Sequence, residues 1–418
     1  MLLSRFRTIP LADAQAWLFF LKITALFMAS LSVRPAVIGE IESSLGLALA
    51  LGALVLHLLE LGFSKRPLQL PAQNGFLLIV IMLLWSYIAL QGFFADSERY
   101  DFIFKAVILH MLFLLSAGLI LMDAKSNQAF FKLWIYFLAL NALSYAITLA
   151  LGQVVGLTRL YLFSLNIPGY ENSGNLYLPV TMVYRNSLFG ENIPRLMGFL
   201  REPGILQALY VWAIVATLYI PLRWRWLIIT LLVMGVFATF STTGLALLGG
   251  TLGLVIIIGR PKYLSFEYLA SLSWRVILLI FLFIVFALGV YYMPGFGLAY
   301  KLDKQYTSFS DRFEAVISSF ESVAEKPWGL GLYGLREDNA GINLLAQMSM
   351  LGIIGFILVC AVYFLPFLFA EHKLSYLLAT LPLFLTALLS QPLVDAPLIY
   401  LFLMLRSQKS TAKDSVDA

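Results

Sequence analysis

The arginines of two polar stretches are the residues of this chain best suited to chemistry. The stretch 152–204 holds four arginines and no lysine, and Arg195 and Arg201 stand near its end, just before an apolar segment. The stretch 295–342 holds Arg312. A guanidinium offers a planar fork of donors that matches a phosphate bidentately, whereas an ammonium acts as a point charge. These residues indicate a site for a phosphate-bearing anion, the alternative being that they pair with nearby acids.

The end of the first stretch also predicts where a helix begins. Pro203 has a fixed φ and no amide hydrogen, so we expect a span to start at about Pro203. Glu202 would then stand beside the helix N-terminus, where the macrodipole favours a carboxylate. Glu202 is therefore either a simple helix-start acid or a functional group. Gly198 permits a tight turn that would bring both neighbouring arginines over the mouth of the helix bundle.

The second stretch predicts an amphipathic helix followed by a turn. Between positions 310 and 323, apolar residues recur at spacings of three and four, the signature of one buried helical face. These residues are Phe313, Val316, Ile317, Phe320 and Val323. Arg312 falls near the start of this helix, and Gly329 and Gly331 follow its end, where they allow backbone shapes closed to other residues. The alternative is an interfacial helix that merely covers the bundle.

The composition places these stretches in a membrane protein. Of the 418 residues, 61% are hydrophobic and only 12% are charged, against about 25% charged in soluble proteins. Segments near or above the roughly 20 apolar residues needed to cross a bilayer recur along the chain. Twelve spans are predicted, at 15–33, 44–63, 75–94, 102–122, 130–151, 205–222, 226–240, 244–259, 276–293, 343–370, 375–389 and 396–405.

The expected fold is therefore an all-α polytopic membrane protein with about 12 transmembrane helices and two long periplasmic loops that contain short helices. Residues 1–418 form one integral membrane domain, and the loops are 152–204 and 295–342. Cys360 is the single cysteine, which excludes an intramolecular disulfide. Lys22 and Glu60 lie deep in predicted spans, where they could pair across neighbouring helices or serve a function.

Lysine and arginine determine the predicted orientation. With the N-terminus in the cytoplasm, every inside segment carries at least one basic residue, as the positive-inside rule requires. The short outside loops lack a base or balance it with acids, as Glu40 and Glu42 balance Arg34. Both termini are then cytoplasmic, and both long loops lie outside. The net charge of +5 reflects this topology and gives no support to a nucleic-acid partner.

In their order along the chain, these motifs resemble the O-antigen ligase and polymerase superfamily of bacterial inner-membrane glycosyltransferases. The resemblance covers about 185–356 in motifs and the whole chain in topology. It rests on Arg195-x-x-Gly198-x-x-x-Glu202-Pro203 before a span, then Arg312, Pro327-x-Gly329-x-Gly331, and Asn343 leading into Gly352-x-x-Gly355.

The resemblance implies a glycan donor carried on undecaprenyl diphosphate and used at the periplasmic face. Cleaving the sugar from this lipid leaves a diphosphate, whose developing negative charge fixed cations stabilise. By this resemblance Arg195 and Arg312 are the first candidates for diphosphate contact, followed by Arg201, Arg336 and Arg185. No metal ion or cofactor is implied. The implied partners are membrane lipids, a flippase and a chain-length regulator.

One departure from the family pattern separates two kinds of enzyme. Ligases of the superfamily place a histidine shortly before the span that begins here at Asn343, and this chain has none there. Its histidines are His57, His110 and His372. We therefore expect a polymerase for O antigen or exopolysaccharide, with a ligase acting on the lipid A core as the alternative. Glu202 and Asp338 are then the candidate bases for the acceptor hydroxyl.

A transporter, such as a polysaccharide flippase, is the alternative from another class. Transporters bind their substrates near the bilayer midplane and often show inverted repeats. The predicted midplane of this chain is poor in charge, and no repeat is visible. The exterior position of the arginines favours chemistry at the membrane surface instead.

Overall fold

Helices form nearly all the regular structure of the computed structural model, which describes residues 11–94, 100–166, 174–184, 194–258, 307–332 and 342–406, with positions 288, 291, 292 and 299. The long helices are α1 (Leu11–Leu31), α3 (Ser43–Ser64), α4 (Ala72–Phe94), α5 (Tyr100–Leu121), α6 (Ala124–Val155), α8 (Pro203–Ala216), α9 (Arg225–Ala238), α10 (Thr242–Ile258), α13 (Thr307–Glu325), α14 (Met348–Phe364) and α15 (Lys373–Leu389). The short ones are α2 (Val37–Ile41), α7 (Leu157–Leu160), the 3-10 helix η2 (Leu365–Phe369) and α16 (Pro397–Phe402).

Five of these helices are long and apolar enough to cross a membrane, namely α3, α4, α5, α6 and α14 continued by η2. The shorter apolar helices α1, α8, α9, α10 and α15 coincide with further predicted spans. Together they confirm a predominantly helical membrane protein. The predicted span 276–293 lies almost wholly outside the described residues, so the count of twelve spans stays a prediction.

The helix α8 lies in the interior of the bundle. Its 14 residues rise about 21 Å, less than the roughly 30 Å of a bilayer's hydrocarbon core. All of them are buried, because α9, α10 and α15 pack around this helix. Helix ends at membrane depth are tolerated where protein rather than lipid covers them. The N-terminus of α8 can therefore lie below the surface while remaining accessible to the two long loops.

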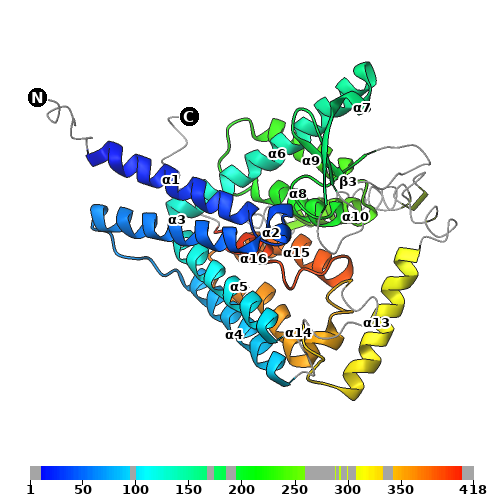
Figure 1. Ribbon diagram of the computed structural model, residues 1–418. Helices are drawn as coiled ribbons and strands as arrows, with labels where there is room; N and C mark the ends of the chain where they lie inside the picture. The colour runs from blue at the N-terminus through cyan, green and yellow to red at the C-terminus, as the bar shows by residue number, and fades with distance from the viewer. Residues whose placement is uncertain are drawn as a thin grey trace, which may run out of the picture.

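Helices that follow one another in the sequence also pack together. In Figure 1, α1 and α3 run side by side, and α4 and α5 form a second pair beneath them. The long helix α6 packs on α9. Helix α13 stands at the right edge of Figure 1 and contacts α14.

Segments assigned to the same side of the membrane contact one another. Asn74 donates hydrogen bonds to the carbonyl oxygens of Leu121 and Met404, which joins the predicted cytoplasmic ends of three spans. The Arg201 amide donates to the Pro35 carbonyl at 3.0 Å, which joins two segments predicted to lie outside. These contacts agree with the alternation of the spans. Which set faces the cytoplasm stays a prediction.

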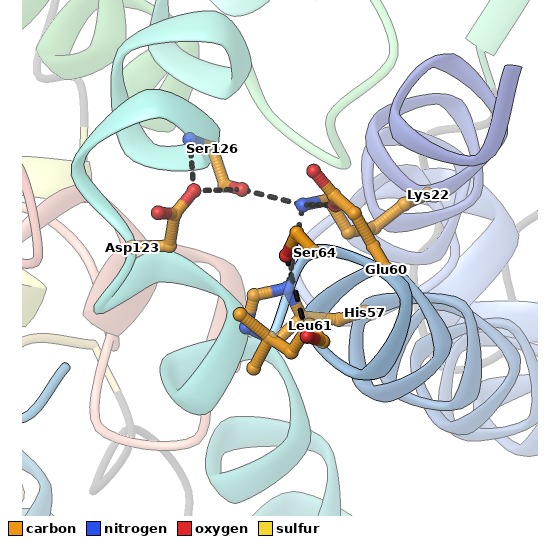
Figure 2. A network of polar contacts seen from close by, with 7 residues as sticks. All are labelled: Lys22, His57, Glu60, Leu61, Ser64, Asp123 and Ser126. Atoms are coloured by element: carbon orange, nitrogen blue, oxygen red, sulfur yellow. Dashed lines mark hydrogen bonds and ion pairs between the residues drawn. The ribbon is translucent and has the colours of Figure 1, made fainter. Parts of the chain in front are cut away.

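A buried ion pair fastens α1 to α3, as predicted for Lys22 and Glu60. The Lys22 side chain is 0% exposed; its ammonium pairs with Glu60, donates to Ser126 Oγ at 2.7 Å and lies 3.3 Å from His57 Nδ1 (Figure 2). The Ser126 hydroxyl in turn donates to Asp123, the N-cap residue of α6. A buried ammonium requires such partners. The network therefore holds α1, α3 and α6 together near one end of the bundle.

The first long loop forms a small antiparallel sheet in addition to the short helix α7. Its strands are β1 (Tyr161–Leu165), β2 (Gly174–Tyr177), β3 (Thr181–Tyr184) and β4 (Arg195–Leu196), in this order across the sheet. The loop contains a short helix as predicted, but its four strands were not predicted. β3 shows the two-residue period of a strand, because Thr181 and Val183 are buried while Met182 and Tyr184 are half-buried.

Helix α13 confirms the helix predicted in the second long loop, with Arg312 in its first two turns. The face of α13 that was predicted to be buried is largely exposed. Phe313, Ile317 and Phe320 are 62%, 45% and 51% exposed. Of the predicted stripe only Val323, 6% exposed, is buried, because its position at the end of α13 also belongs to the face that packs.

Small side chains form that packing face of α13. Ala315 and Ser319 are 8% and 2% exposed, and the Ser319 hydroxyl accepts a hydrogen bond from the Ser349 amide at 2.8 Å. Small residues let α13 approach the start of α14 closely. The large apolar side chains point the other way, as in a helix that rests in a membrane interface.

Candidate functional site

The segment between β4 and α8 is held at both ends. β4 pairs with β3, which sets Arg195 opposite Tyr184. Gly198 then turns the chain with a φ of +59°, a left-handed conformation that glycine adopts without strain. α8 begins at Pro203 with Glu202 as its N-cap residue, so the predicted helix start and the predicted turn are both confirmed.

Arg201 belongs to a buried group of four charges, Arg34, Glu40, Arg201 and Asp395, which we call the charge quartet. Arg201 Nη1 lies 2.8 Å from Glu40 Oε1, and its Nη2 donates to the Pro392 carbonyl at 3.1 Å. Arg34 Nε lies 3.1 Å from Glu40 Oε2, and Arg34 Nη1 lies 3.0 Å from Asp395 Oδ2. The Arg201 and Glu40 side chains are only 3% and 2% exposed. Two positive and two negative charges offset one another, as buried ions require.

The charge quartet ties three connecting segments to the start of α8: the α1–α3 connection, the β4–α8 segment and the α15–α16 connection. Arg201 therefore fixes the segment that carries Glu202. Sequence reasoning grouped Arg34 with Glu40 but missed Asp395. The available signal was that Asp395 is the only charged residue in a short outside loop.

Arg195 lies between the sheet and the end of α9. Its Nε donates a hydrogen bond to the Thr239 carbonyl at 3.1 Å, and its guanidinium carbon is 5.9 Å from the centre of the Tyr184 ring. Thr239 is the C-cap residue of α9, so a cation here is also favoured by the helix dipole. The side chain is partly buried. Its position is thus set by two elements.

Arg312 of the second long loop is partly buried and interacts electrostatically with Glu202 at the start of α8. Its Nε is buried and has no hydrogen-bond partner among the described residues. Burial lowers the pKa of Arg312, and the negative charges of Glu202 and Asp311 oppose this shift. Glu202 belongs to the first loop and Arg312 to the second. A carboxylate and a partly desolvated guanidinium from separate loops therefore interact electrostatically at the N-terminus of α8.

Glu202 does not use its side chain as a helix cap. As the N-cap residue of α8 it has extended backbone angles, φ −147° and ψ 145°, yet its carboxylate makes no capping hydrogen bond. The side chain is partly exposed. A simple helix-start acid would bond the free amides of the first turn. The carboxylate is thus available for another contact.

The Pro327-x-Gly329-x-Gly331 motif docks on a break in α14. Gly352 interrupts this helix with a φ of +68° and a ψ of 179°. The Gly331 amide donates to the Met350 carbonyl at 2.9 Å. A Cβ atom added at Gly329 would come within 2.4 Å of the Gly352 nitrogen, so the two backbones approach too closely for a side chain. Gly329 and Gly331 themselves have φ values of +80° and +91°, as predicted for unusual backbone shapes.

Two side chains of α4 hold this docked motif. The Tyr87 hydroxyl donates to the carbonyl oxygens of Trp328 and Leu351, at 3.1 and 3.0 Å. Gln91 donates to the Met350 carbonyl at 2.8 Å. These bonds satisfy carbonyl groups freed by the helix break. The end of α13 is therefore anchored to α4 and α14, which limits where Arg312 can lie.

Three predicted site residues, Arg185, Arg336 and Asp338, lie outside the described residues. Of the predicted residues that are described, Glu202 and Arg312 interact electrostatically, Arg201 belongs to the charge quartet, and Arg195 is held against α9. Within the described ranges, no three His, Cys, Asp or Glu side chains are grouped so that they could hold a metal ion.

Comparison with known protein families, with curated proteins and with solved structures finds no match for this chain.

Proposed function

We propose that this protein is a polysaccharide polymerase of the bacterial inner membrane. It transfers a glycan from undecaprenyl diphosphate to the end of a lipid-linked repeat unit at the periplasmic face. The observations that carry this proposal are the buried Nε of Arg312 in the second long loop, which has no partner among the described residues, and its electrostatic interaction with Glu202 of the first.

The arginines supply what the departing diphosphate needs. Arg312 has a buried Nε without a partner among the described residues, so an anion that bound there would satisfy a donor at no loss of an existing bond. Guanidinium groups fixed before the reaction stabilise negative charge as it develops on the leaving group. Arg195 is the second contact, and Arg201 acts through the charge quartet as a positioning residue. Arg336 and Arg185 remain lower-ranked candidates.

Glu202 is the general base in this proposal, with Asp338 as the other candidate. An acceptor hydroxyl attacks the anomeric carbon of the donor sugar, and its proton passes to the carboxylate. The bond between that carbon and the diphosphate oxygen breaks, and the diphosphate leaves with the electron pair. The partly exposed Glu202 side chain, free of a capping bond, suits this role.

Alanine substitution of Arg195 and of Arg312 tests the proposal. Loss of one fixed donor to a developing anion lowers rates by about 10²–10³, so each variant should lose glycan extension to that degree in a purified system with lipid-linked repeat units. Arg159→Ala is the matched control, because Arg159 is an exposed arginine of the same loop on α7. Extension at the wild-type rate in both variants would reject the diphosphate contacts.

The acceptor and the reaction class are tested separately. Deletion of the gene should leave a surface glycan of one repeat unit if the protein is a polymerase. Loss of every glycan from the lipid core would instead indicate a ligase. Purified protein in detergent should lengthen lipid-linked glycan, whereas a flippase would require sealed vesicles and would join no sugars.

A further inference from the structure

An apolar groove runs between α6 and the sheet of the first long loop, and we call it the α6 groove. Its volume is about 440 Å³, within the range of ligand sites. One wall is Leu140, Leu143 and Ile147 of α6, and the other is the turn between β2 and β3, including Val180. Its lining is almost entirely apolar.

Hydrogen bonds hold the two walls of the α6 groove in place. The Ser144 hydroxyl donates to the Val180 carbonyl at 2.8 Å, and the Thr148 hydroxyl donates to the Leu178 carbonyl at 2.8 Å. Further along, the Tyr145 hydroxyl donates to the Pro194 carbonyl at 2.7 Å. The sheet is thus fastened to α6 by hydroxyl groups, and the groove beside these contacts is a built feature.

The open side of the α6 groove is bordered by exposed apolar side chains of a predicted membrane span. α6 is one of the helices long and apolar enough to cross a membrane. On it, Leu140, Leu143 and Ile147 are 61%, 38% and 40% exposed. An apolar chain could therefore enter the groove from the lipid phase without crossing water.

The other end of the α6 groove lies beside the segment that carries Arg195. Gly198 and Phe199 line the groove. Gly198 follows Arg195 by three residues, so their Cα atoms are at most about 11 Å apart. The groove therefore ends at the backbone segment that carries Arg195.

We propose that the α6 groove binds the first isoprene units of the lipid-linked donor, next to its diphosphate. This rests on the proposed function. In a prenyl diphosphate the anionic group is attached directly to the first carbon of the apolar chain, which matches an apolar groove that ends at the segment carrying Arg195. A phospholipid separates its phosphate from its acyl chains by a glycerol ester, so it fits this spacing less well.

Photolabelling with a benzophenone-bearing farnesyl diphosphate tests the groove directly. Irradiation of the full-length protein in lipid nanodiscs should label peptides of α6 and of the β2–β3 turn. Leu143→Trp fills the groove and should lower labelling at least several-fold. Leu151→Trp is the matched control, because Leu151 is an α6 residue that is 43% exposed and does not line the groove. Val180→Trp, at a 68% exposed turn position, approaches the same space from the other wall.

The outcomes separate the groove from the proposed function. Equal labelling of the Leu143→Trp, Val180→Trp and Leu151→Trp proteins would overturn the proposed binding in the groove. So would labelling in detergent that phospholipid suppresses as strongly as unlabelled farnesyl diphosphate does at the same concentration. If Leu143→Trp suppresses labelling while the wild type joins no sugars, prenyl binding in the α6 groove is supported and the proposed function is refuted. If Arg195→Ala abolishes transfer while Leu143→Trp leaves both labelling and the KM for the long-chain donor unchanged, prenyl binding in the α6 groove is refuted and the proposed function is not.

Discussion

Replacing Glu40 by alanine tests how strongly the charge quartet holds the start of α8. Glu40 faces Arg34 at 3.1 Å and Arg201 at 2.8 Å, and its side chain is 2% exposed. Without it, the charge quartet keeps two positive charges and one negative charge, that of Asp395. The buried group would then carry a net charge of about one unit, which the protein interior solvates poorly.

The magnitude follows from burial. Breaking a buried ion pair by removing one partner lowers the free energy of unfolding by about 3–5 kcal/mol, since the other charge is left uncompensated. The pair between Arg406 and Glu371 is the contrast. Its atoms lie 3.6 Å apart and the Glu371 side chain is 60% exposed, so Glu371→Ala should change stability by less than about 1 kcal/mol.

Thermal unfolding of the purified variants, followed by loss of monodisperse protein in one detergent, measures this difference. The decrease in melting temperature for Glu40→Ala should exceed that for Glu371→Ala at least threefold, the ratio of the two free energies. The double variant Glu40→Ala/Arg201→Met should recover part of the loss, because it removes the stranded guanidinium as well. Equal shifts for the two single variants, or strictly additive losses in the double variant, would refute the reasoning.

Three other substitutions have defined outcomes. Arg312→Lys should be partly active, and its kcat/KM should fall as the pH rises from about 7 to 10. Burial lowers the pKa of a cation at this position, and the pKa of lysine is normally about 10.4. A decline at alkaline pH identical to that of the wild type would contradict this prediction. Gly352→Ala should lower the free energy of unfolding by more than about 1–2 kcal/mol, because φ is +68° and the new Cβ would lie 2.4 Å from the Trp328 carbonyl carbon. Gly52→Ala is the control and should not lower it, because no described atom lies within 4 Å of its new Cβ. Lys22→Met should lower the melting temperature by leaving Glu60 without its buried partner, and Lys22→Met/Glu60→Gln should restore part of it; no loss in the single variant would exclude a structural role for the pair.

Features that depend on local rules could be predicted from the sequence. The start of α8 follows from the fixed φ of Pro203, and the turn before it follows from the absent Cβ of Gly198. The pairing of Lys22 with Glu60 follows because a charge buried among apolar helices needs a partner. Each of these inferences needed only neighbouring residues or one physical requirement.

Features that depend on distant contacts or on the surrounding solvent could not be predicted. Asp395 and Arg34 are 361 positions apart, and nothing near either one indicates that they meet. The apolar stripe of α13 showed that one face avoids water, but a bilayer offers an apolar medium outside the protein as well as inside it. The spacing of Phe313 and Phe320 therefore predicted the helix correctly, but these side chains lie on its exposed face and not on its buried one.

The outward stripe of α13 makes lipid a structural component of the candidate site. Phe313, Ile317 and Phe320 have no cover from the described residues that would hold that side of the helix, whereas Ser319 and the docked glycine motif hold the other. The tilt of α13, and with it the distance between Arg312 and Glu202, should then respond to bilayer thickness and to the detergent that replaces the bilayer. Short-chain and long-chain lipids should therefore alter this distance differently, and measurements of the proposed transfer should be compared only within one lipid or one detergent.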